Sequence, residues 1–97
     1  FLNAPDVMEV RTSEYNGQVG SMLYCTVHDD FEVMSVKAQI FDHTGRLLES
    51  GCAAKMDLEA EGWEYKATVT NPLVTGSRIV ITGTDRPENT GVKEVVL

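Results

Sequence analysis

The chain has little positive charge and no long hydrophobic run. Its 8 Lys and Arg residues stand against 15 Asp and Glu residues, which gives a net charge of −7. A surface with this excess of acid repels nucleic-acid phosphates and anionic lipid headgroups, so neither class of partner is expected. The hydrophobic content of 42% and charged content of 24% are ordinary for a globular protein. Membrane insertion and intrinsic disorder are therefore not indicated.

The usual features of a natural N-terminus are missing. The chain starts Phe1-Leu2-Asn3-Ala4-Pro5, without an initiator Met, a basic segment or an apolar signal core. We interpret it as a segment cut from a longer chain, or as a mature processed form. Its 97 residues contain no internal repeat, low-complexity tract or linker, and this length suits one hydrophobic core. We expect residues 1–97 to form a single domain.

Helical periodicity is almost absent, whereas apolar and polar residues alternate in short runs. These runs recur about every ten residues between clusters of Gly, Asn, Asp and Pro, which is typical of β-strands joined by turns. The closing segment has two β-branched runs around the turn-rich residues 85–91 and predicts a hairpin. Strands are predicted near residues 7–11, 22–28, 36–40, 46–52 and 62–70, and in the two arms of that closing hairpin.

The sharpest local signal is Asp42-His43-Thr44-Gly45-Arg46. Asp at the first position and Gly at the fourth favour a type I turn with a left-handed Gly, which joins two antiparallel strands. If Asp42 pairs with Arg46, regular pairing sets Ile40 opposite Leu48, Ala38 opposite Ser50 and Val36 opposite Cys52. This register predicts that Cys52 lies on the core face.

The number and spacing of the strands predict the fold class. Seven short strands in so short a chain favour an all-β, seven-stranded antiparallel β-sandwich, because one open sheet could not cover its own apolar face. A closed barrel is the main alternative.

Residues 27–48, 63–69 and 81–89 carry a family resemblance. They contain an acidic loop before the third strand, a Gly turn after it, and an Asp-containing loop that ends in Asn89 before the last strand. This pattern resembles the bacterial immunoglobulin-like and fibronectin type III-like modules of secreted or surface proteins. The resemblance covers roughly residues 20–97 and implies that the seven-stranded sandwich is of immunoglobulin-like type and that its location is extracytoplasmic.

Two cysteines and two histidines raise the question of a metal site or a disulfide. Cys25, His28, His43 and Cys52 have the ligand types of zinc, but the predicted strands place His28 and His43 at opposite ends of the domain. A disulfide would need the two cysteine Cα atoms within about 7 Å, whereas facing sheets lie about 10 Å apart. Antibody domains carry their second cysteine on strand six, which has none here. We expect two buried free thiols.

Catalytic motifs are absent, and no enzyme activity is expected. The chain has no Gly-x-Ser-x-Gly elbow, phosphate-binding glycine loop or metalloprotease motif. Trp63 and Tyr65 could form an aromatic platform for sugar, but they alternate in phase with Ala67 and Val69, which favours a place in the core. Tyr15 and Tyr24 fall off the predicted core face and are candidates for surface contact.

Acidic residues are concentrated in loops that a sandwich brings to one end. In this strand order the loops after strands two, four and six meet there. Such a group favours a hard cation such as calcium, or a basic partner, and the alternative is a solvated acidic rim. The candidate cluster comprises Asp29, Asp30, Asp57, Glu59, Asp85 and Glu88, with Glu32 and Glu61 in the same loops.

Two functional hypotheses follow. The first is a non-catalytic structural or interaction module of a larger extracytoplasmic bacterial protein, which acts as a spacer, adhesion or docking unit beside neighbouring domains or another protein. The second is a carbohydrate- or calcium-binding accessory module attached to a surface enzyme. An exposed aromatic patch would favour the second, and the phase of Trp63 and Tyr65 does not supply one. Apart from that calcium alternative, no cofactor is expected.

Overall fold

A computed structural model describes residues 4–29, 32–86 and 88–97. Within them the chain forms eight β-strands and no helix. The strands are β1 (Asp6–Arg11), β2 (Met22–His28), β3 (Val33–Phe41), β4 (Leu47–Cys52), β5 (Ala54–Lys55), β6 (Gly62–Lys66), β7 (Arg78–Asp85) and β8 (Thr90–Val96).

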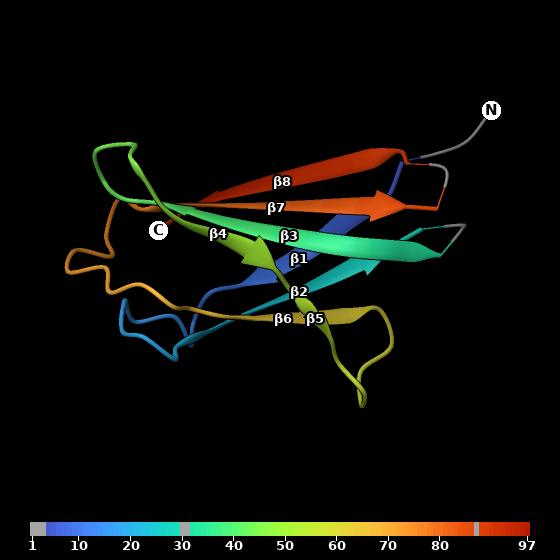
Figure 1. Cartoon of the computed structure of the whole chain (residues 1–97), viewed down its shortest axis with the longest axis horizontal. Helices are drawn as coiled ribbons and strands as arrows, with labels where there is room; N and C mark the ends of the chain where they lie inside the picture. Colours follow the sequence, from blue (N-terminus) through green and yellow to red (C-terminus); the bar gives the residue numbers. More distant parts are fainter. Residues whose placement is uncertain (1–3, 30–31, 87) are drawn as a thin grey trace.

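The strands form two four-stranded antiparallel sheets. The first sheet has the order β1-β2-β6-β5 and the second has the order β4-β3-β7-β8. In Figure 1 the second sheet runs from β8 at the top down to β4, and the first sheet lies beneath it. The predicted all-β class is confirmed, but the predicted count of seven strands is wrong. The additional strand is β5, where the chain leaves the second sheet after Cys52 and pairs Ala54 with Glu64 of the first.

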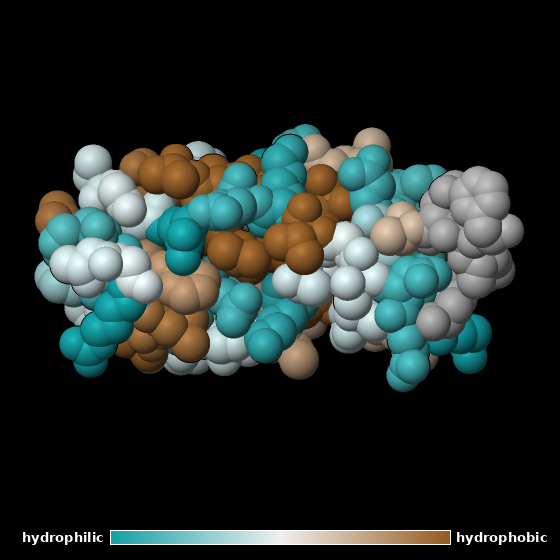
Figure 2. All heavy atoms as spheres, turned by 90° about the horizontal axis from the view of Figure 1, so that it is seen from above, coloured by the Kyte–Doolittle hydropathy of each residue, from teal (hydrophilic) through white to brown (hydrophobic). Residues whose placement is uncertain are grey.

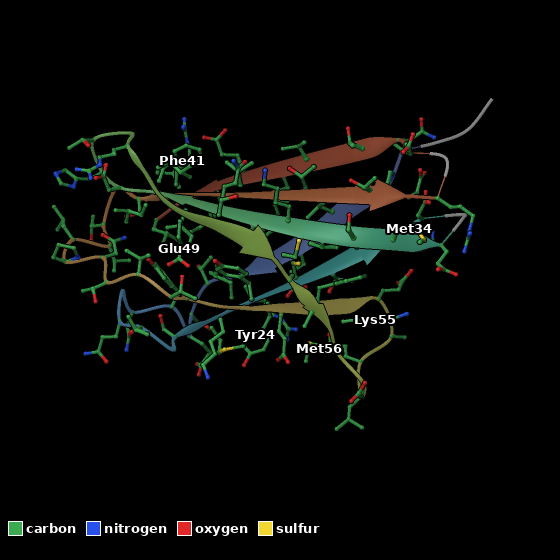
Figure 3. The ribbon with its side chains drawn as sticks, viewed as in Figure 1. Tyr24, Met34, Phe41, Glu49, Lys55 and Met56 are labelled. Atoms are coloured by element: carbon green, nitrogen blue, oxygen red, sulfur yellow. The ribbon has the colours of Figure 1, made fainter. Side chains whose placement is uncertain are left out.

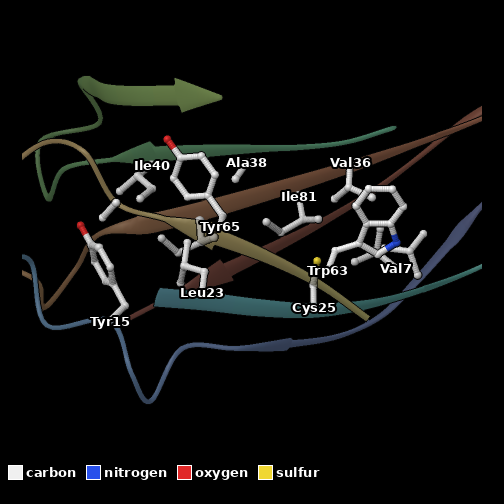
Figure 4. Close-up of a cluster of buried hydrophobic side chains, with 13 residues drawn as sticks. Val7, Tyr15, Leu23, Cys25, Val36, Ala38, Ile40, Trp63, Tyr65 and Ile81 are labelled. Atoms are coloured by element: carbon white, nitrogen blue, oxygen red, sulfur yellow. The ribbon is translucent and has the colours of Figure 1, made fainter. Parts of the chain in front are cut away.

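The core lies between the sheets and is built from the alternating apolar residues (Figure 4). Trp63 and Tyr65 of β6 are each 7% exposed, so the prediction that they pack in the core is confirmed. The largest fully buried aliphatic side chains come from the central strands β2, β3 and β7, and are Leu23, Val27, Val36, Ile40, Ile79 and Ile81.

The turn between β3 and β4 forms as predicted. The backbone N–H of Asp42 donates to the carbonyl of Arg46 at 2.8 Å, and Gly45 adopts a left-handed φ of 90°. The Asp42 carboxylate accepts hydrogen bonds from the backbone N–H groups of Thr44 and Arg46 at 2.9 and 3.0 Å. Hydrogen bonds to the ionised carboxylate lower the pKa of Asp42, and the bond from the Thr44 hydroxyl has the largest effect.

The register beyond this turn differs from the prediction because β4 contains a β-bulge. Phe41 pairs with Leu47, but Ile40 then pairs with Glu49, so Leu48 is the extra residue. One inserted residue exchanges the two faces of the rest of the strand. Glu49 consequently turns into the core, with 7% of its surface exposed. Cys52 pairs with Lys37 and is exposed, so its predicted place on the core face is wrong.

Two further features differ from the prediction, the end of β6 and the position of Tyr15. β6 ends at Lys66 rather than continuing to residue 70, and Val69, predicted to face the core, is 36% exposed. Tyr15 was expected at the surface, yet it is only 5% exposed. Its hydroxyl accepts a hydrogen bond from the Asn71 side chain at 3.2 Å, which joins the loop after β1 to the loop after β6. Burial raises the pKa of Tyr15.

Candidate functional site

The acidic loops follow β2, β5 and β7. Figure 1 shows β2 and β7 ending at the right, while the loop after β5 lies lower and nearer the centre. Asp29, Asp57 and Glu59 belong to the first two loops, Asp85 ends β7, and Glu88 follows it. Asp30 lies outside the described residues.

Several of these acids have partners of their own rather than a shared centre. Glu59 contacts the Arg11 guanidinium at 3.1 Å, and Asp85, only 1% exposed, accepts the Asn89 N–H at 2.8 Å. Glu61 of the same loops contacts His28. Within residues 4–29, 32–86 and 88–97, no three His, Cys, Asp or Glu side chains are grouped closely enough to hold a metal ion. The described geometry therefore gives no support to the calcium alternative.

The two cysteines have opposite environments. Both are free thiols; Cys25 of β2 is buried in the core and Cys52 of β4 is exposed. Burial raises the pKa of Cys25 to about 11, so this thiol stays protonated at neutral pH. His43 lies in the β3–β4 turn, at the end of the sandwich away from His28 (Figure 1). The four predicted zinc-type residues do not come together.

Thiol reactivity should separate the two cysteines. We expect one equivalent of thiol per folded chain to react with a disulfide reagent, and the second to react only after unfolding, because thiolate formation at Cys25 requires exposure. Cys52→Ser should abolish the fast phase. Two fast equivalents in the folded wild type, or none, would contradict the assigned environments.

The aromatic residues offer no open stacking platform at the predicted position. Trp63 and Tyr65 are both buried. Tyr24 is half-buried on the outer face of the first sheet, and the Arg11 guanidinium lies 5.5 Å from the centre of its ring. These positions do not favour the carbohydrate alternative.

Glu49 forms a buried polar centre that the sequence pattern did not indicate. Its Oε1 accepts hydrogen bonds from the Tyr65 hydroxyl at 2.7 Å and from the backbone N–H of Thr68 at 2.9 Å. The Thr68 hydroxyl donates to the same atom at 3.0 Å, and the Val69 N–H donates to Oε2 at 3.2 Å. Figure 3 shows Glu49 in the space between the sheets. The two carboxylate oxygens of Glu49 therefore accept four hydrogen bonds, and every partner is a donor.

This centre holds the end of β6 against β4. The N–H groups of Thr68 and Val69 donate to a side chain instead of a neighbouring strand, which explains why β6 ends before them. Burial and the hydrogen bond to Glu49 together raise the pKa of Tyr65 to about 12. The one available sequence signal was the pair Leu47-Leu48, which interrupts the alternation immediately before Glu49.

The outer faces of the two sheets differ in charge. The first sheet presents Asp6, Glu9, Arg11, Glu64 and Lys66 outward. The outer face of the second sheet, here called the charge-poor face, carries two positive charges and one negative charge. The register defines it by Thr90, Val92, Glu94 and Val96 of β8, Arg78, Val80, Thr82 and Thr84 of β7, Ser35, Lys37, Gln39 and Phe41 of β3, and Leu47, Ser50 and Cys52 of β4.

Even the few charges on this face are partly neutralised. Arg78 contacts Glu94 at 3.1 Å, and its guanidinium lies 4.6 Å from the centre of the Phe41 ring. Val92 and Val96 are 63% and 67% exposed. Figure 2, which views the molecule from the side of β8, shows apolar atoms exposed among polar ones. The face is mostly uncharged and partly apolar, which are properties of an interface core.

A groove adjoins the charge-poor face at the edge of β4. Its volume is about 440 Å³, and it separates Ser50, Gly51 and Cys52 from the β6 side. Tyr65, Lys66 and Thr68 form the opposite wall. The side chain of an added strand could enter this groove while its backbone lies along β4.

The described residues include no helical stretch with the length and apolar character needed to traverse a bilayer. Comparison with protein-family models, with curated proteins and with solved structures found no match to the chain. Its function is therefore inferred from its own surfaces.

Proposed function

We propose that this domain is a non-catalytic interaction module of a larger extracytoplasmic bacterial protein, in which it acts as a spacer, adhesion or docking unit. The charge-poor face carries the proposal. On a chain with a net charge of −7, a face that includes a single acid, Glu94, is a local departure from the rest of the surface. Interface cores are depleted of charged residues in the same way.

The strand order supports an immunoglobulin-like assignment within this proposal. Immunoglobulin-like domains place strands A, B, E and D in one sheet, and C, F and G in the other. The order β1-β2-β6-β5 corresponds to A-B-E-D, and β3-β7-β8 corresponds to C-F-G, with β4 as an additional edge strand. The module is accordingly proposed as an immunoglobulin-like or fibronectin type III-like sandwich.

The size of the charge-poor face suits a modest contact. Four strands spaced about 4.8 Å apart, with about six residues each at about 3.3 Å, give a surface roughly 20 Å on each side. Contacts of this size are typical of weak complexes and of neighbouring domains rather than of obligate subunits.

Site-specific photo-crosslinking in cells that produce the parent protein tests the interaction role. Thr82 lies on the charge-poor face, and Thr26 is its matched control, because both are half-buried threonines on central strands of opposite sheets. A crosslinking residue at Thr82 should give a discrete adduct that is absent when the residue stands at Thr26. No adduct at Thr82, or equal adducts at both positions, would contradict the proposal.

Cell fractionation tests the location separately. The parent protein should be found outside the cytoplasm, and its full reading frame should include an export signal. Recovery only from the cytosol would exclude an extracytoplasmic module, whatever the crosslinking result.

A further inference from the structure

The four outer edges of the two sheets are protected to different degrees. An unpaired strand edge exposes backbone N–H and C=O groups, and proteins commonly block it with charges, bulges or short strands. β1 has a bulge between Val7 and Glu9. β5 has only two residues, one of which is Lys55. β8 carries Lys93 and Glu94 in succession.

β4 alone lacks an exposed charge along its edge. Its one charged residue, Glu49, points into the core, and the outward positions near the groove are Ser50 and Cys52. Although β4 contains a bulge, it lies at Leu48 and leaves regular pairing with β3 from Glu49 to Cys52. The β4 edge is therefore open to another strand.

The backbone groups available on this edge follow from the register. The Ala53 N–H donates to the Val36 carbonyl of β3 at 2.7 Å. In an antiparallel pair such bonds alternate, so Gly51 and Glu49 also direct their N–H and C=O groups toward β3. Ser50 and Cys52 direct theirs away from it. β3 is the only strand that pairs with β4 in the described part of the chain, which leaves these groups open to a partner.

We infer that β4 pairs antiparallel with β4 of a second copy of this chain, which joins the two second sheets into one continuous eight-stranded sheet. The inference names a partner for the proposed interaction module and so rests on that function. Such pairing would extend the charge-poor face from one copy to the other, since β4 is the edge strand of this face.

The arrangement of charge sets the orientation in which two copies would pair. In Figure 1 β4 runs toward the acidic end of the sandwich. Antiparallel pairing therefore places the two acidic ends at opposite ends of the dimer, where repulsion between two chains of net charge −7 is smallest. A register centred on Ser50 sets Ser50 opposite its counterpart and Leu48 opposite Cys52, so no like charges face each other across the strands.

Sedimentation equilibrium from micromolar to millimolar protein, with reductant present, tests the inference. The wild type should dimerise, and added salt should strengthen the dimer because it screens the repulsion between the acidic chains. Ser50→Pro removes an outward N–H without removing a bond to β3 and should weaken dimerisation at least about tenfold, since each intermolecular backbone bond contributes about 1 kcal/mol. Ser50→Lys, which adds a charge to the edge, should weaken it in the same direction.

Val92→Pro is the matched control at the opposite edge of the same sheet. The Leu97 N–H donates to Ser77 at 2.8 Å, so by alternation Val92 points its own N–H away from β7. This variant should dimerise like the wild type. A thermal melt of each variant verifies that it is folded.

Three results would overturn the inference. The first is a wild type that stays monomeric at millimolar concentration. The second is a dimer that Val92→Pro disrupts while the folded Ser50 variants leave it intact. The third is a dimer that added salt weakens. A monomeric wild type whose Thr82 position still crosslinks to a different protein would leave the proposed function standing and remove only the second copy as partner.

Discussion

Replacing Glu49 with alanine is expected to lower the free energy of unfolding by about 3–5 kcal/mol, because the Tyr65 hydroxyl and two backbone N–H groups lose their acceptor in the interior. A domain of this size is stable by only about 5–15 kcal/mol, so the variant should be close to unfolding. Chemical denaturation gives the free energy, and the melting temperature should fall by roughly 4–8 °C for each kcal/mol lost.

Two variants separate the hydrogen bonds from the loss of volume. Glu49→Gln keeps the size of the side chain and one acceptor oxygen, so its free energy of unfolding should lie between those of Glu49→Ala and the wild type. Tyr65→Phe removes one bond and should cost about 1 kcal/mol. Glu14 is exposed, and its side chain makes no hydrogen bond or ion pair within the described residues, so Glu14→Ala should stay within about 0.5 kcal/mol of the wild type. If Glu49→Ala behaved like Glu14→Ala, Glu49 would not be the buried acceptor described above.

Replacing Gly17 with alanine is expected to cost more than about 3 kcal/mol, since it combines backbone strain with a collision. Gly17 has a φ of 85°, which favours glycine, and an added Cβ would lie 2.2 Å from the backbone oxygen of Asn71. The Asn71 N–H also donates to the Gly17 carbonyl at 2.6 Å. The loops after β1 and β6 would have to separate, with loss of the Asn71 contacts to Tyr15 and Ser77.

Gly45→Ala introduces the backbone strain without the collision, so it measures the strain alone. Gly45 has a similar φ of 90°, but an added Cβ would meet no atom within 4 Å. Its cost should be about 1 kcal/mol, the usual penalty of the left-handed region for a non-glycine residue. Chemical denaturation of both variants measures the difference. Equal losses would mean that the Gly17 loop does not pack against Asn71.

The sequence was sufficient to predict the two-layer core because alternation is a local property. Leu23, Cys25 and Val27 share a face of β2, and Val36, Ala38 and Ile40 share a face of β3, as their spacing predicts. The turn at Asp42 is equally local, since the side chain, the Gly and the closing hydrogen bond lie within five residues.

The missed features depend on contacts that are remote in the chain. The bulge at Leu48 places Glu49 inside, and that position is favourable only because donors 16 to 20 residues later converge on it. Tyr15 is buried by Asn71, 56 residues away. Neither partner leaves a periodic signal near the residue that it stabilises, so alternation alone misplaced Cys52 and Tyr15.

Amide hydrogen exchange along β4 in dilute protein tests the central claim most directly, because the bulge decides which amides face β3. With the bulge at Leu48, the N–H groups of Glu49, Gly51 and Ala53 should exchange slowly, and those of Ser50 and Cys52 should exchange rapidly. A regular hairpin would reverse the pattern. Slow exchange at Ser50 and Cys52 with fast exchange at Gly51 would contradict the buried place of Glu49 and the open edge of β4 together.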